Sequence, residues 1–107
     1  MPAQLKPTGG LEGCGVLVTG GGTGIGAACA RGAAADGAAV TICGRTEATL
    51  MASAEKIASE VQHGGSIRYV VGDVTDEDDV ARVVAAAVEP TGTLDGVVAN
   101  AGGGGPL

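Results

Sequence analysis

A run of closely spaced glycines gives this chain its clearest chemical signal. The segment Thr19-Gly20-Gly21-Gly22-Thr23-Gly24-Ile25-Gly26 follows a short apolar run and opens an alanine-rich stretch. Glycines at a strand-to-helix turn let the backbone approach a pyrophosphate, and the N–H groups and dipole at the helix start favour the anion. Gly20, Gly24 and Gly26 occupy the positions that this role requires. A glycine-rich turn can also merely connect two elements, so the placement between strand and helix is what favours nucleotide binding.

Three polar residues follow the later apolar runs, namely Arg45, Asp73 and Asn100. In isolation, Asp73 is compatible with a turn and Asn100 with a strand-end cap. Arg45 is compatible either with a phosphate-binding guanidinium or with a solvated residue in the first turn of a helix. Their chemistry therefore depends on the elements that position them.

Four apolar runs alternate with three helical patterns, which is typical of a parallel α/β sheet. The expected strands are 15–19, 39–43, 67–71 and 94–99, and the expected helices are 24–36, 46 to just before 64, and 75 to about 88. We expect Thr46 to cap the second helix and Thr75 with Asp78 to cap the third, where Asp76, Glu77 and Asp79 place negative charge at the positive end. Right-handed crossovers are expected between these strands, and if the first half is wound in the Rossmann manner the strand order is 3-2-1-4, with the fourth strand at an edge.

Composition narrows the classes of partner and of site. The net charge is −6 and the basic residues are scattered, which argues against nucleic acid. No apolar stretch reaches the length of a membrane span or forms a secretory signal, so we expect no membrane association and a cytoplasmic location. Cys14, Cys29 and Cys43 form no C-x-x-C pair, which indicates buried thiols in a reducing compartment rather than disulfides or a metal site.

The glycine pattern and its companions resemble the short-chain dehydrogenase/reductase family. TGGGTGIG is similar to that family's T-G-x-x-x-G-x-G fingerprint, and Asn100-Ala101-Gly102 is similar to its N-A-G after the fourth strand. The resemblance covers about residues 12–105 and implies a doubly wound, Rossmann-like fold with a nicotinamide dinucleotide cofactor. It also implies that the carboxylate of Asp73, in Gly72-Asp73-Val74, binds the adenine amino group. The implied cofactor-binding residues are Gly20, Gly22, Thr23, Gly24, Ile25, Gly26, Arg45, Asp73, Val74, Asn100, Ala101 and Gly102.

The end of the second strand bears on the choice of cofactor. Similar proteins that use NAD commonly carry an acidic residue near Gly44, whereas this chain reads Cys43-Gly44-Arg45. A guanidinium at Arg45 can bind the 2′-phosphate of NADP. We therefore expect NADP, with NAD as the alternative, although Thr23 is not the basic residue that some NADP-using relatives place in the glycine-rich loop.

The catalytic residues that the resemblance implies are missing from this chain. The family uses a Tyr, a Lys four residues later and an upstream Ser, with the lysine lowering the pKa of the tyrosine. Here the only tyrosine is Tyr69, Asp73 lies four residues further on, and the lysines are Lys6 and Lys56. We therefore interpret Tyr69 as structural and expect the chain alone to be inactive. Asn100 is not the family's catalytic Asn, which belongs to the following helix.

The sequence thus predicts a flexible lead-in over residues 1–13 and a partial NAD(P)-binding domain over 14–107. Our main interpretation is the cofactor-binding portion of an NADP(H)-dependent oxidoreductase that transfers hydride between nicotinamide and a carbonyl or alcohol substrate. The resemblance implies a homo-oligomer for a complete protein. Two alternatives stay open: a non-catalytic nucleotide-binding or regulatory module, and a non-functional gene remnant.

Overall fold

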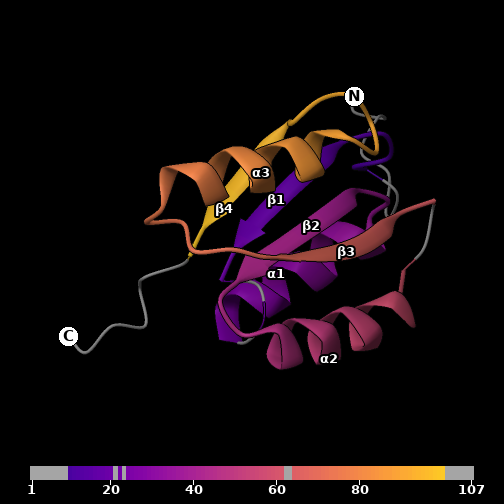
Figure 1. The fold of residues 1–107 in the computed structure, drawn as a ribbon. Helices are drawn as coiled ribbons and strands as arrows, with labels where there is room; N and C mark the ends of the chain where they lie inside the picture. The colour runs from indigo at the N-terminus through magenta and orange to yellow at the C-terminus, as the bar shows by residue number, and fades with distance from the viewer. Residues whose placement is uncertain (1–9, 21, 23, 62–63, 101–107) are drawn as a thin grey trace.

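The chain forms a parallel β-sheet flanked by helices on both faces (Figure 1). The computed structural model describes residues 10–20, 22, 24–61 and 64–100. Its elements, in chain order, are β1 (Gly15–Thr19), α1 (Gly24–Ala35), β2 (Ala39–Gly44), α2 (Glu47–Ala58), β3 (Ser66–Val71), α3 (Glu77–Val88) and β4 (Gly96–Ala99). The strands lie in the order β3-β2-β1-β4, which confirms the predicted α/β topology with β4 at one edge of the described sheet.

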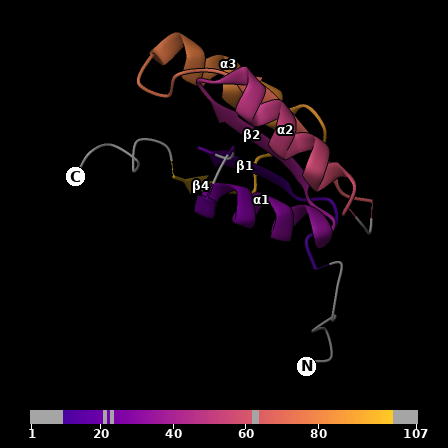
Figure 2. The ribbon, with the colours of Figure 1, turned by 90° about the horizontal axis from the view of Figure 1, so that it is seen from below.

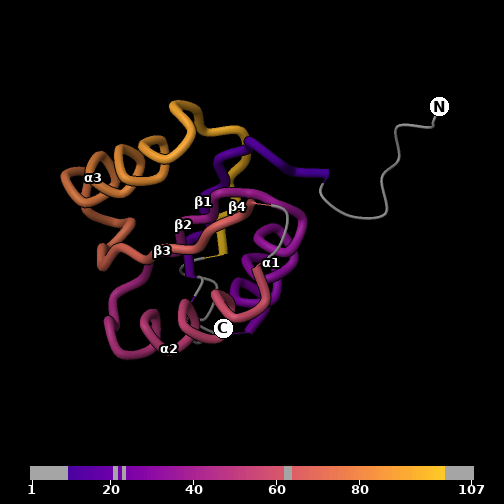
Figure 3. Tube along the Cα trace, turned by 90° about the vertical axis from the view of Figure 1, so that its right-hand side faces the viewer, coloured from indigo at the N-terminus to yellow at the C-terminus, as the bar shows by residue number. Residues whose placement is uncertain are grey.

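Helices α1 and α2 cover one face of the sheet, and α3 covers the other. Figure 2 shows α1 and α2 running along the strands, and Figure 3 shows α3 apart from them across the sheet. This division follows from right-handed crossovers, because the chain moves from β1 through β2 to β3 in one direction and then returns to β4 in the other. The order of the strands therefore dictates which helix covers which face.

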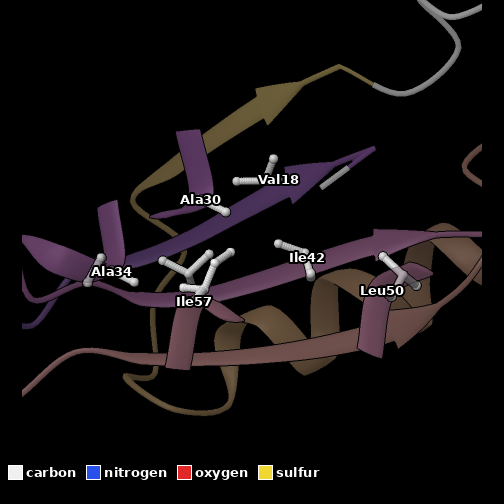
Figure 4. Packing of buried hydrophobic residues seen from close by; sticks show 8 residues of the cluster. Val18, Ala30, Ala34, Ile42, Leu50 and Ile57 are labelled. Carbon is white, nitrogen blue, oxygen red and sulfur yellow. The ribbon is translucent and has the colours of Figure 1, made fainter. Parts of the chain in front are cut away.

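The core is built from aliphatic side chains of modest size. On the α1 and α2 face, Val18 and Ile42 pack with Ala30, Leu50 and Ile57 (Figure 4). The alanines of α1 allow that helix to lie close to the strands, where a larger side chain would hold it away. The opposite face is closed by a smaller cluster: Leu17, Cys43, Val83 and Ala87.

Two helix starts differ from the sequence expectation. Thr46 stands at the N-cap of α2, but its side chain makes no capping hydrogen bond. The predicted cap of α3 by Thr75 with Asp78 is wrong, because Asp76 is the N-cap and its carboxylate accepts the backbone N–H groups of Asp78 and Asp79. The hydroxyl of Thr75 instead donates to Asp73 at 2.6 Å. The Thr75 hydroxyl is therefore engaged by the Asp73 carboxylate and does not cap α3.

Other element ends shift by a few residues. Helix α2 ends at Ala58 instead of continuing toward Gly64. Strand β4 begins at Gly96 because Asp95 bonds to the first residue of β1: its carboxylate accepts the Gly15 N–H at 2.8 Å, and its own N–H donates to the Gly15 carbonyl at 2.8 Å. Before β1, Leu11 packs against the larger core cluster and its N–H donates to the Asp36 carbonyl at 3.0 Å.

Candidate functional site

The four sequence-predicted segments meet at the carboxyl edge of the sheet. Because all the described strand pairs are parallel, the strands end on the same side (Figure 1). Gly20 follows β1, Arg45 follows β2, Asp73 comes soon after β3 and Asn100 follows β4. Ligands of open α/β sheets bind outside the carboxyl ends of the strands, at the point where the strand order reverses. In this chain that point lies between β1 and β4.

The turn from β1 into α1 is closed so tightly that it leaves no room for a side chain at Gly26. Gly26 is buried, and a Cβ there would overlap the Gly20 carbonyl oxygen and come within 3.0 Å of the Asn100 side-chain nitrogen. Gly20 and Gly24 have φ values of 71° and 59°, the left-handed region that glycine adopts without strain. This closure brings the start of α1 directly to the end of β1.

The start of α1 is suited to an anion. Its first turn contains no acidic residue, and the Ile25 side chain is 72% exposed. The unpaired N–H groups and the dipole at a helix N-terminus favour negative charge. Gly22 lies against α2, where a Cβ would come within 2.9 Å of the Thr49 methyl group. Thr23 lies outside the described residues.

Thr19 links this turn to the end of β4. Its hydroxyl donates to the Val98 carbonyl at 3.3 Å and accepts the Asn100 N–H at 2.9 Å. The Asn100 amide is thereby placed beside Gly26. Sequence reasoning included Thr19 in the motif but did not assign it a role, because the hydrogen bond joins residues 81 positions apart. Ala101 and Gly102 lie outside the described residues.

Asp73 forms a hydrogen-bonded turn after β3. One oxygen of its carboxylate accepts the Thr75 N–H at 2.9 Å as well as the Thr75 hydroxyl. These hydrogen bonds, together with the positive charge of Arg45, lower the pKa of Asp73. The carboxylate is therefore an anionic acceptor at neutral pH. Val74, the neighbouring predicted residue, is half-buried and packs against the smaller core cluster on the face that α3 covers.

Arg45 is exposed at the bend that follows β2, close enough to Asp73 to influence its pKa. Within the described parts of the chain, the ion pairs are Arg31–Glu60, Arg68–Glu89 and Arg82–Asp79, and Arg45 belongs to none of them. In a chain of net charge −6, an unpaired guanidinium at the carboxyl edge is available for an external anion.

A separate shallow groove lies between α1 and α2. Its volume is about 530 Å³, and its lining residues are Gly22, Ala27, Ala48, Thr49, Ala52, Ser53 and Lys56. Among the described residues, Gly22 is the one predicted site residue that the groove and the carboxyl-edge site share. The chemistry-bearing residues Arg45, Asp73 and Asn100 do not line it.

The cysteines and Tyr69 have surroundings of a different kind. All three thiols are free, and burial raises the pKa of Cys43. Cys14 is only half-buried and Cys29 is exposed on α1, so the prediction that all three thiols are buried is confirmed at Cys43 alone. The described residues contain no cluster of potential metal ligands.

The Tyr69 hydroxyl donates to the Glu47 carboxylate at 3.1 Å, and this hydrogen bond raises the pKa of Tyr69.

No helix in the described part of the chain combines the length and the hydropathy of a membrane span.

Comparison with known proteins identifies the family. The family profile described as short chain dehydrogenase matches residues 15–107. A glucose 1-dehydrogenase from Gluconobacter oxydans is 43% identical over 102 residues, which are 95% of this chain and 37% of that protein. Hydroxysteroid dehydrogenase-like protein 2 from Bos taurus is 38% identical over 105 residues, which are 92% of this chain and 24% of that protein.

Solved structures agree with the sequence relatives. A short-chain type dehydrogenase/reductase from Mycobacterium ulcerans superposes with a TM-score of 0.80 at 42% identity, covering 83% of this chain and 32% of that one. Glucose dehydrogenase from Caenorhabditis elegans superposes with a TM-score of 0.77 at 33% identity, covering 86% of this chain and 39% of that one. The chain therefore spans less than two fifths of the length of these relatives. It belongs to the short-chain dehydrogenase family and corresponds to the N-terminal part of its members.

Proposed function

We propose that this chain binds the adenosine and pyrophosphate part of NADP(H), as the cofactor-binding portion of an oxidoreductase that acts on a carbonyl or alcohol. The observation that carries the proposal is the closed turn at Gly26, where the Gly20 backbone occupies the space that a side chain would need. The first turn of α1, which starts at this point, contains no acidic residue. Such a turn lets a pyrophosphate approach the N–H groups of the helix. When bound, the nicotinamide supplies the hydride chemistry, and the protein supplies binding and orientation.

Each carboxyl-edge residue has a role in this proposal. The turn formed by Gly20, Gly22, Thr23, Gly24, Ile25 and Gly26 holds the pyrophosphate. Asp73 accepts the adenine amino group, with Val74 beside it. Asn100, followed by Ala101 and Gly102, supports the turn from β4. Residues 14–107 form the partial NAD(P)-binding domain in this proposal, and substrate and oligomer contacts belong to the remainder of a complete protein.

Arg45 is the residue that favours NADP over NAD. Its guanidinium is exposed and unpaired among the described residues, and no acidic side chain stands at Gly44 to bind a ribose hydroxyl. A charge-assisted hydrogen bond worth roughly 1.5–3 kcal/mol favours the phosphorylated cofactor by about 10- to 150-fold. NAD is the alternative, and binding data decide between them.

The proposal is tested with a fragment of the cofactor that contacts only these residues. Adenosine 2′,5′-bisphosphate and adenosine 5′-monophosphate are titrated into the ¹⁵N-labelled chain, and backbone amide shifts are followed by NMR. We expect saturable shifts at Gly20, Gly26, Asp73 and Asn100, with tighter binding of the bisphosphate. Equal affinity for the two ligands would favour NAD, and the absence of saturable shifts at these amides would exclude the site.

The catalytic part of the proposal is tested on the gene. We expect the reading frame beyond the codon for Leu107 to encode a Ser followed by Tyr-x-x-x-Lys. An in-frame stop instead would leave a binding module or a gene remnant, and the NMR titration separates these two because only the module binds the nucleotide.

A further inference from the structure

Two side chains of α3, Asp79 and Arg82, form hydrogen bonds with the backbone of the turn that contains Asp73. The carboxylate of Asp79 accepts the Asp73 N–H at 2.8 Å. Arg82 donates to the other Asp79 oxygen at 3.1 Å and to the Val71 carbonyl at 2.8 Å. Arg82 and Asp79 therefore bind the chain on both sides of Gly72.

Gly72 allows this close approach. It is buried, its N–H donates to the Gly44 carbonyl at 2.8 Å, and a Cβ at this position would come within 2.9 Å of a Val83 methyl group and 3.4 Å of the Arg82 guanidinium. The segment from Val71 to Asp73 thus lies directly against α3. Its backbone is held by contacts with the first two turns of that helix and by the bond to Gly44.

Within the described residues, these contacts leave one oxygen of the Asp73 carboxylate without a partner. Thr75 occupies Oδ1 through its N–H and its hydroxyl, and Asp79 occupies the Asp73 backbone N–H. An aspartate that is fixed at its backbone and at one carboxylate oxygen presents the other oxygen in a single direction. Preorganisation of this kind improves binding because less conformational entropy is lost when the ligand arrives.

We infer that Asp79 and Arg82 are positioning residues that orient Asp73 toward the exocyclic amine of a purine, and so determine selectivity for adenine over hypoxanthine. This inference deepens the proposed function and rests on it. Arg82 also matters electrostatically, because its positive charge offsets the repulsion between the Asp79 and Asp73 carboxylates. The same ion pair lowers the pKa of Asp79 after the larger effect of the Asp73 N–H, so Asp79 stays ionised as an acceptor.

The test compares two ligands in each of four proteins. Adenosine 2′,5′-bisphosphate and inosine 2′,5′-bisphosphate, which differ at the 6-position of the base, are titrated by NMR into the chain and its variants. The wild-type chain should bind the adenosine ligand about tenfold more tightly, as expected for one hydrogen bond to a charged acceptor. In the Asp79→Ala variant this ratio should fall to about one.

Two further variants separate positioning from general effects. Asp78→Ala removes the same charge from the same helix turn, but the Asp78 carboxylate has no hydrogen-bond partner among the described residues, so the ratio should stay at its wild-type value. Asp79→Asn keeps an oxygen that accepts the Asp73 N–H and should restore most of the ratio. Because both ligands bind the same folded population, partial unfolding of a variant cancels from the ratio.

The outcomes distinguish the two levels of the argument. A wild-type chain that binds neither ligand would overturn the proposed function, and this inference with it. Binding with equal affinity for adenosine and inosine would overturn the adenine role of Asp73. If the wild-type chain prefers adenosine and the Asp79→Ala variant retains that preference, the inference fails while the proposed function stands.

Discussion

The backbone of Gly26 lies against the carbonyl oxygen of Gly20, with no space between them for a Cβ atom. The contact joins the first turn of α1 to the residue that follows β1. Core packing and the candidate phosphate site therefore depend on one close approach. The glycine is required here by the neighbouring backbone, since a helix interior would otherwise favour alanine.

Replacing Gly26 with alanine should destabilise the chain and remove nucleotide binding together. The new methyl group would overlap backbone atoms of Gly20, which cannot move away as a flexible side chain can. We expect a loss of roughly 1–3 kcal/mol in the free energy of unfolding, typical of overpacking. Urea denaturation measures the stability, and NMR titration with adenosine 2′,5′-bisphosphate measures the binding.

Gly32→Ala is the matched control on the same helix. Gly32 is exposed, and a Cβ there would meet nothing within 4 Å. The same substitution should therefore stabilise the chain by about 0.5–1 kcal/mol and leave binding unchanged. Equal effects of the two substitutions would show that helix propensity, and not the contact with Gly20, governs both positions.

Thr41 is a second position where the structure predicts an unusual response. It lies in the central strand β2, its side chain is fully buried, and its hydroxyl has no hydrogen-bond partner in the described structure. A buried polar group without a partner costs about 1–3 kcal/mol. Thr41→Val keeps the branched shape and removes the hydroxyl, so thermal and urea melting should show a more stable protein. A destabilised valine variant would indicate that the hydroxyl is satisfied by an internal water.

Local sequence patterns were sufficient to predict the alternation and the approximate extent of the elements, and the assumption of a Rossmann-type winding supplied the strand order. Apolar runs separated by glycines mark buried strands, and right-handed crossovers leave few possible orders. Helix ends were less predictable, because several polar residues compete for the same N–H groups. At the start of α3, Thr75 was the predicted cap, but its hydroxyl binds Asp73 and the carboxylate of Asp76 caps the helix instead.

The support of the candidate site could not be predicted in the same way. The sequence predicted only that Asp79, like its acidic neighbours, interacts with the positive end of the α3 dipole. Its position in the sequence does not indicate a contact with Asp73. Its bond to the Asp73 N–H depends on how closely α3 lies to the chain after β3. The link from Thr19 to Asn100 likewise needs the pairing of β1 with β4. Tertiary contacts of this kind are not encoded in any short window of sequence.

Arg45→Gln tests the expected cofactor preference. Glutamine retains hydrogen-bonding capacity but removes the charge, so the preference for adenosine 2′,5′-bisphosphate over the 5′-monophosphate should fall by about tenfold or more. Arg31→Gln is the charge-matched control, because Arg31 is exposed on α1 and pairs with Glu60. The measurement is the ratio of dissociation constants in each variant. A parallel loss in both variants would assign the effect to the overall charge of the chain.

The link between Asp95 and Gly15 should make stability depend on acidity. The Gly15 N–H, followed by the Thr93 hydroxyl, lowers the pKa of Asp95 in the folded chain. A group with a depressed folded pKa contributes stability above its unfolded pKa, about 3.9, and loses that contribution as the pH falls through the folded value. Stability should therefore decrease below about pH 4.

Asp95→Asn isolates the contribution of this carboxylate. The variant should be less stable than the wild type at pH 7, and the difference should shrink as the pH falls and the wild-type carboxylate becomes protonated. Urea denaturation at pH 7 and at about pH 3 measures both differences. Asp78→Asn serves as the control, because its carboxylate has no hydrogen-bond partner in the described structure. A constant difference between the Asp95 variant and the wild type across this range would mean that the stabilising effect of the bond to Gly15 does not depend on ionisation of the Asp95 carboxyl group.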